Sequence, residues 1–104
     1  MIRIPSTATL KKYGLTSHEW LFILANQDYK CAICKNSLED RRCNTDHYHV
    51  IGFKKMKPEE KKKYIRGILC WTCNKLIVGR GVTLNRLYFA VEYLEAFEKR
   101  LNEI

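Results

Sequence analysis

Two Cys-x-x-Cys pairs, at residues 31–34 and 70–73, constrain this chain more than any other feature of its sequence. Each pair can form a tight turn that presents two sulfurs to one ion, and four thiolates suit tetrahedral zinc. Four sulfur ligands leave no open coordination position, so the predicted zinc site is structural. The expected ligands are Cys31, Cys34, Cys70 and Cys73. Any chemistry must then come from polar residues between and beside the pairs.

A zinc site would also compensate for the small size of the chain. With 104 residues, we expect a single domain over 1–104, near the lower end of the size at which one hydrophobic core suffices. Metal binding would add to the folding free energy. Hydrophobic residues make up 46% and charged residues 29% of the sequence, and this ordinary balance argues against wholesale disorder.

The charge balance is strongly basic and indicates a polyanionic partner. Nineteen Lys and Arg against eleven Asp and Glu give a formal net charge of +8. Such an excess favours nucleic acid first and an anionic membrane surface second. Residues 1–12 lack the apolar run of a signal peptide, and the longest apolar run, residues 20–25, is too short to cross a bilayer. We therefore expect a soluble protein that is not secreted.

In a reducing compartment, paired thiols are metal ligands more often than disulfides. The fifth cysteine, Cys43, belongs to neither pair. Its isolated position favours a partly buried free thiol over a zinc ligand.

The clearest helix signal begins at Thr16. Glu19, three residues later, completes a capping box, and Leu15 and Trp20 are spaced as a hydrophobic staple. Apolar residues then follow helical spacing as far as Gln27. We expect this helix to pack its apolar side on the zinc core.

Shorter signals predict the other elements of a small α+β fold. These are a strand over 42–50, a short helix from Pro58, a strand or knuckle over 65–69, a helical turn after Cys73 that ends near Gly79 or Gly81, and a last helix over 83–102. The last helix is apolar on one side, and we expect it to belong mostly to the core, with a second subunit as the alternative partner. Its apolar positions are Leu84, Leu87, Tyr88, Val91, Leu94 and Leu101.

The spacer between the cysteine pairs, residues 35–69, is longer than the roughly 15 to 20 residues of a plain zinc ribbon. It contains Asp46, His47 and His49. A carboxylate from Asp46 and an amide oxygen from Asn74 would suit a hard divalent cation, and a neutral His47 could take a proton from water. With a basic surface, these are the parts for metal-assisted hydrolysis of a phosphodiester.

Each of these residues also has an ordinary structural interpretation. An Asp-His pair is common in surface turns, Asn74 could cap a helix, and His49 could orient a neighbour or be solvated. There is also a geometric condition. On a regular strand His47 and His49 share a face while Asp46 points away, so Asp46 and His47 meet at one site only if the strand ends or bends.

Several segments, in order, resemble the phage recombination endonuclease VII family, part of the larger His-Asn-His (HNH, ββα-metal or His-Me finger) nucleases. The match extends over roughly residues 13–79, with a weak similarity near residues 90–94. The matching segments are Tyr13-Gly14-Leu15-Thr16, Gln27, Cys31-Ala32-Ile33-Cys34, Asp46-His47-Tyr48-His49, Arg66-Gly67-Ile68-Leu69-Cys70 and Cys73-Asn74.

The resemblance implies a ββα-metal core beside the four-cysteine zinc site, flanked by an N-terminal and a C-terminal helix. By position, Asp46 and Asn74 would hold a catalytic Mg²⁺ or Mn²⁺ and His47 would be the general base. His49 would position the phosphate or share the base role. The family cuts DNA to leave 5′-phosphate and 3′-hydroxyl ends, which implies a phage or bacterial protein in the cytoplasm of a bacterial cell.

The sequence departs from the family in two places. Residues 54–64 form a longer and more basic insert, and the chain ends soon after the last predicted helix, so we do not extend the resemblance to the resolution of branched DNA. A charge run is often a solvated face, but beside a phosphodiesterase site it favours phosphate contact. The predicted contacts are Lys54, Lys55, Lys57, Lys61, Lys62, Lys63 and Arg66.

Two other function classes compete with a DNA endonuclease. One is a non-catalytic zinc module that binds DNA or a protein, and the other is a structural subunit of a larger assembly. For an endonuclease, one active site per chain cuts one strand, so a concerted double cut needs a homodimer or sequential events.

Overall fold

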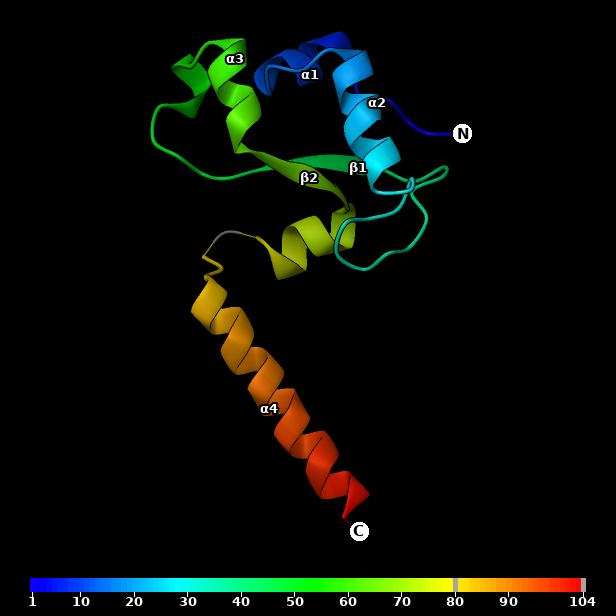
Figure 1. The fold of residues 1–104 in the computed structure, drawn as a ribbon, viewed down its shortest axis with the longest axis vertical. Coiled ribbons are helices and arrows are strands. Elements are labelled where there is room, and N and C mark those ends of the chain that lie inside the picture. Colours follow the sequence, from blue (N-terminus) through cyan, green and yellow to red (C-terminus); the bar gives the residue numbers. More distant parts are fainter. Residues whose placement is uncertain (80, 104) are drawn as a thin grey trace.

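The computed structural model describes residues 1–79 and 81–103 and has a small α+β fold with one two-stranded antiparallel sheet (Figure 1). The predicted fold class is thus confirmed at this level. The elements in order are α1 (Thr7–Lys12), α2 (Ser17–Asn26), β1 (Cys43–His47), the 3₁₀ turn η1 (Phe53–Lys55), α3 (Pro58–Lys61), the 3₁₀ turn η2 (Lys62–Tyr64), β2 (Ile65–Cys70), the π-helix η3 (Cys73–Ile77) and α4 (Leu84–Asn102).

Helix α2 begins where the capping box predicts. Thr16 Oγ1 accepts a hydrogen bond from Glu19 N at 3.2 Å, and the Glu19 carboxylate accepts one from Thr16 N at 2.9 Å. The helix buries Trp20 and Leu24 completely. Trp20 Nε1 donates to Thr45 Oγ1 at 3.0 Å, so the buried indole has its polar partner on β1. The capped helix is therefore fixed to the strand that carries the candidate site.

The side chain of Gln27 joins the end of α2 to β2. Its Nε2 donates to the carbonyl oxygens of Ile68 and Lys30, and its Oε1 accepts from Ile68 N at 2.8 Å. A Cβ atom at Gly67 would lie 3.0 Å from Gln27 Oε1, so the close approach of this side chain favours glycine there. Sequence patterns assigned Gln27 to the end of a helix but gave no sign of this bridge.

Both predicted strands are present, and their pairing is irregular at one point. Asp46 pairs with Gly67, but the next residue, His47, pairs with Ile65, which leaves Arg66 as an extra residue on β2. This β-bulge coincides with the end of β1. The first predicted strand is therefore shorter than expected, because the ladder stops at His47 and the chain turns away.

No pattern in the sequence predicted α1. Ser6 caps this short helix by accepting a hydrogen bond from Thr9 N at 3.2 Å, and Leu10 is its one buried residue. A single buried position gives no periodic signal. Gly14 follows with φ +70°, and a Cβ there would lie 2.8 Å from Pro58 O, so the turn after α1 packs against α3.

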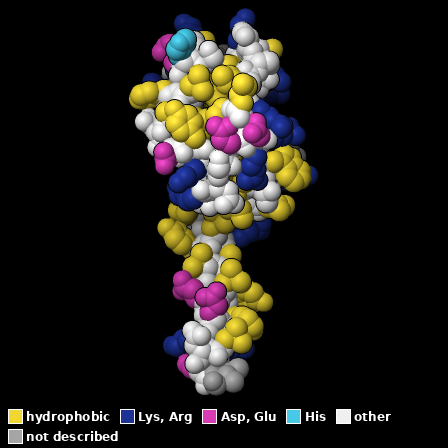
Figure 2. All heavy atoms as spheres, turned by 90° about the vertical axis from the view of Figure 1, so that its right-hand side faces the viewer, with side chains coloured by type: hydrophobic (Ala, Val, Ile, Leu, Met, Phe, Trp, Pro, Cys, Tyr) yellow, Lys and Arg dark blue, Asp and Glu magenta, His cyan; other side chains and the backbone are white. Residues whose placement is uncertain are grey.

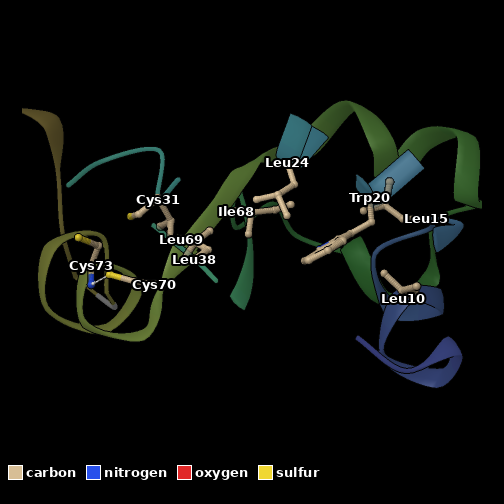
Figure 3. Packing of buried hydrophobic residues seen from close by; sticks show 10 residues of the cluster. All are labelled: Leu10, Leu15, Trp20, Leu24, Cys31, Leu38, Ile68, Leu69, Cys70 and Cys73. Carbon is tan, nitrogen blue, oxygen red and sulfur yellow. Dashed lines mark hydrogen bonds between the residues drawn. The ribbon is translucent and has the colours of Figure 1, made fainter. Parts of the chain in front are cut away.

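The core lies between α1, α2, β2 and the cysteine cluster (Figure 3). The expectation that α2 packs on the zinc core is confirmed, because Leu24 and Ile68 belong to the same cluster as the thiols. The buried cluster contains Leu10, Leu15, Trp20, Leu24, Cys31, Leu38, Ile68, Leu69, Cys70 and Cys73.

Helix α4 exists as predicted, with Thr83 as its N-cap, but its assignment to the core was wrong. It extends away from the rest of the molecule and has no buried residue (Figure 1). Phe89 is 66% and Tyr93 77% exposed. An amphipathic pattern shows which side of a helix is apolar and not what covers that side. None of the described helices is long and apolar enough to cross a membrane.

The Gln27 bridge gives a stability prediction. Gln27→Ala should lower the free energy of unfolding by about 2 kcal/mol, because the backbone N–H of buried Ile68 loses its side-chain acceptor and the Ile68 C=O keeps Ala32 N as a donor but loses the amide of Gln27. Urea unfolding of the zinc-loaded protein, followed by circular dichroism, measures the change. The control is Asn26→Ala, at an exposed position of the same helix, which should cost less than about 0.5 kcal/mol. Equal effects of the two substitutions would contradict the bridge.

Candidate functional site

The four paired cysteines form one cluster, as predicted. The sulfur atoms of Cys31, Cys34, Cys70 and Cys73 all lie within 4.8 Å of one another. The first pair is in the loop after α2, and the second joins the end of β2 to η3. Within residues 1–79 and 81–103, no other group of three or more His, Cys, Asp or Glu side chains is placed to hold a metal ion. Its donor set fits a structural zinc ion.

The thiols of this cluster have unequal acidities. Burial raises the pKa of Cys31, but hydrogen bonds from backbone groups of Cys70 and Cys34 outweigh it, and the pKa falls to about 6. Burial and the neighbouring cysteine side chains raise the pKa of Cys73. The thiolate form of Cys31 is therefore favoured at neutral pH, and a bound dication would favour the thiolate form of its cysteine ligands.

Cys43 is separate from the cluster, as its isolated position predicted. It is a half-buried free thiol whose Sγ lies 3.5 Å from Arg41 O. Burial raises its pKa above that of an ordinary thiol, which makes it less reactive.

One pocket of about 440 Å³ is lined by Asp46, His47, His49 and Asn74. The end of β1 and the bulge meet the geometric condition set by the sequence, because the ladder becomes irregular between Asp46 and His47. Asn74 lies in η3 directly after a cysteine of the cluster. The cluster therefore fixes η3 beside the end of β1, and residues far apart in the chain line the same pocket.

The imidazole of His47 is held in an aromatic environment. It stacks on the ring of Phe53 at 4.3 Å between centroids, with Tyr13 at 5.6 Å and His49 at 4.8 Å. Burial lowers the pKa of His47, His49 acts in the same direction, and the Asp46 carboxylate opposes them. The neutral imidazole, which can accept a proton, is thus favoured at neutral pH.

Asp46 is 7% exposed, and its carboxylate is paired with Arg66. Arg66 Nε donates to Oδ2 at 2.7 Å, and its terminal nitrogen donates to Oδ1 at 3.0 Å. Such a bidentate pair is strong and geometrically specific. The basic run of the sequence predicts a nucleic-acid contact for Arg66 and gives no sign of this pairing, because the pairing depends on the bulge between the two strands.

A sequence model of the recombination endonuclease VII family matches residues 6–96 of this chain. The chain belongs to the recombination endonuclease VII family. It is also similar to the gene 59 proteins of Mycobacterium phages D29 and L5, at 33% and 32% identity over 90 residues. The alignments cover 85% of this chain and 48% of each relative, so the chain spans about half the length of these relatives. No solved structure matches the chain significantly.

The family match covers more of the chain than the motifs of the sequence do. It confirms the resemblance found in the sequence and extends it on both sides, because the matched residues include α1 and most of α4.

The lysines of the basic insert, residues 54–64, differ in their exposure and in their contacts. Lys62 Nζ pairs with Glu19 at 2.7 Å and with Glu59 at 3.2 Å, while Lys61 is buried with its Nζ 5.5 Å from the centre of the Phe53 ring. These two lysines are engaged within the chain. The exposed lysines of the insert are Lys54, Lys55, Lys57 and Lys63.

Some residues that line the pocket were given no role from the sequence. Arg42, Asn44 and Tyr13 are among these lining residues. A strand places every second residue on the same face, so the predicted strand already implied that Arg42 and Asn44 share a face with Asp46. Tyr13 carried no such signal, because it enters the pocket from the end of α1.

The cysteine cluster predicts a sharp difference between two substitutions. Cys70→Ser should abolish bound zinc and cooperative unfolding, because structural zinc contributes roughly 10 to 16 kcal/mol, as much as the whole stability of a small domain. Cys43→Ser should retain both, since Cys43 lies outside the cluster. Zinc content by mass spectrometry and thermal unfolding by circular dichroism measure the two properties. Loss of zinc in Cys43→Ser would contradict the assignment.

Proposed function

We propose that this chain is a metal-dependent DNA endonuclease of the HNH type that hydrolyses phosphodiester bonds to 5′-phosphate and 3′-hydroxyl ends. The observation that carries the proposal is the pocket lined jointly by Asp46, His47 and Asn74 beside the cysteine cluster. The chain order β1, β2 and η3, with residues of β1 and η3 on the walls of the pocket, supports a ββα-metal core. Family membership supplies the nuclease class.

The residues of the pocket fit a catalytic Mg²⁺ or Mn²⁺. Asp46 offers carboxylate oxygens and Asn74 an amide oxygen, which are the ligands that these hard cations prefer. Two protein ligands suffice, because Mg²⁺ commonly keeps several waters and binds phosphate oxygens of the substrate. When bound, the cation would neutralise charge that develops on the phosphate.

In this proposal His47 accepts a proton from the attacking water. Water attacks phosphorus, the bond to the 3′-oxygen breaks, and this oxygen is protonated from solvent. The lowered pKa of His47 keeps the imidazole in the form that accepts a proton. The stack against Phe53 fixes the ring plane. His49, whose ring centre lies 4.8 Å from that of His47, positions the phosphate or shares the base role.

DNA is the proposed partner, and Lys54, Lys55, Lys57 and Lys63 are its proposed phosphate contacts in the insert. Their exposure supports this role, and phosphate contacts would make binding weaken steeply with salt. Lys61 and Lys62 would contribute mainly to the positive electrostatic potential of the surface, because Lys62 is paired with Glu19 and Lys61 packs over the Phe53 ring. Since the relatives are phage proteins, the proposed setting is the cytoplasm of a bacterial host.

The catalytic proposal is tested by His47→Ala. With Mg²⁺, the wild type should nick supercoiled plasmid, and His47→Ala should cut about 10² to 10⁴ times more slowly, because the water loses its base. His18→Ala is the matched control, since His18 is exposed and lies outside the pocket. Zinc content and circular dichroism should be unchanged in both variants.

A negative result would favour the competing function. If the wild type cuts no linear, nicked, flapped or four-way DNA with Mg²⁺ or Mn²⁺, the endonuclease proposal fails. Binding of the same DNAs without cleavage, and with no dependence on His47, would identify a non-catalytic zinc module.

We also propose that two copies pair through α4. Its apolar side is exposed along the helix, and yellow side chains follow α4 in Figure 2. Contiguous apolar surfaces of this kind mark interaction sites. A second copy is the proposed partner because two active sites would allow both DNA strands to be cut.

Sedimentation velocity tests the pairing. The wild type should sediment as a dimer, and Leu94→Glu should shift it to a monomer, because a charge would enter the apolar contact. Glu92→Gln, on the charged side of α4, should leave the dimer intact. A monomeric wild type at micromolar concentration would contradict the proposal.

A further inference from the structure

We infer that Arg66 is an internal counter-cation of Asp46, which holds this carboxylate in the metal-free protein and competes with the divalent cation for it. The inference rests on the proposed function, because it concerns the metal ligand of that reaction. It adds a residue that sets the metal affinity of the pocket.

The ion pair engages both oxygens of the carboxylate. The Arg66 guanidinium donates to Oδ2 at 2.7 Å and to Oδ1 at 3.0 Å. A dication on either oxygen would lie close to this positive group and be repelled by it. Electron density that the carboxylate gives to the guanidinium is also less available to a metal. The pair therefore opposes metal binding for as long as it persists.

Of the two partners, Arg66 is the one that can leave. The Asp46 side chain is 9% exposed and belongs to the regular part of β1, where Gly67 pairs with it. The Arg66 side chain is 41% exposed and comes from the extra residue of the bulge. Within residues 1–79 and 81–103, the Arg66 guanidinium donates hydrogen bonds to Asp46 alone. No second hydrogen bond would hold the guanidinium in place once this pair opens.

A second hollow gives the released side chain room. Arg66 lines a pocket of about 460 Å³ that lies beside the candidate site. The two pockets share His49, Val78 and Gly79 on their walls. The guanidinium can therefore move from the carboxylate into this hollow while the backbone of β2 stays in place.

The alternative is that Arg66 orients Asp46 permanently and remains paired when the metal binds. The two roles predict opposite effects of removing the arginine. Without a competitor, the metal binds more tightly. Without an orienting partner, the carboxylate becomes mobile and the metal binds more weakly.

The test is a titration of zinc-loaded protein with Mn²⁺ in the absence of DNA, with free Mn²⁺ measured by electron paramagnetic resonance. Arg66→Gln should bind Mn²⁺ at least about tenfold more tightly than the wild type, the equivalent of one charge-assisted hydrogen bond. Arg42→Gln removes a positive charge from the pocket that Asp46 lines without touching the ion pair, and should change the affinity less than about threefold. Asp46→Asn should abolish the binding, which assigns it to this pocket.

Arg66→Lys guards against a folding defect in Arg66→Gln. Lysine keeps the positive charge but cannot form the bidentate contact with Asp46. The Mn²⁺ affinity of Arg66→Lys should therefore lie between those of the wild type and Arg66→Gln. Circular dichroism and zinc content verify that both variants fold.

The outcomes separate this inference from the proposed function. If neither the wild type nor any variant binds Mn²⁺ in this pocket, the metal-dependent function itself fails. If the wild type binds Mn²⁺ and the Arg66 variants bind it equally or more weakly, the counter-cation role is overturned while the proposed function stands.

Discussion

Four thiols drawn from two distant segments hold the rest of this protein in its arrangement. The first pair follows α2, the second joins β2 to η3, and their sulfurs lie within 4.8 Å of one another. The buried core is small, and it continues directly into this cluster. In a chain of this size such a site substitutes for the hydrophobic area that a larger domain would bury. Its position also determines where the candidate active site forms, because Asn74 follows the last thiol.

The β-bulge in the sheet shapes the pocket beside the cysteine cluster. The bulge between the strands lets Asp46 and His47 approach the same space, although neighbouring residues of a regular strand point to opposite faces. The same bulge directs Arg66 onto Asp46. Two anchors hold the strands in this register, namely the Trp20 to Thr45 hydrogen bond and the contacts of Gln27 with β2.

The positive charge of the chain is divided between structure and surface. Lys62 stabilises the start of α2 through Glu19, whose pKa it lowers, and Lys61 packs over an aromatic ring. Other lysines of the insert remain exposed. The net charge therefore indicates the kind of partner that the protein binds. The ion pairs within the chain decide which lysine side chains are free to contact that partner.

The sequence by itself determined most of the local elements and the four-cysteine cluster. The capping box fixed the start of α2, the cysteine spacing identified the four-thiol cluster, and the ordered motifs identified the family, because these signals lie in short stretches of chain. Only the tertiary structure decided the Gln27 bridge, the bulge, the pairing of Arg66 with Asp46 and the exposure of α4. Each of these depends on contacts between distant segments or on what covers a surface, and periodicity and spacing do not encode either.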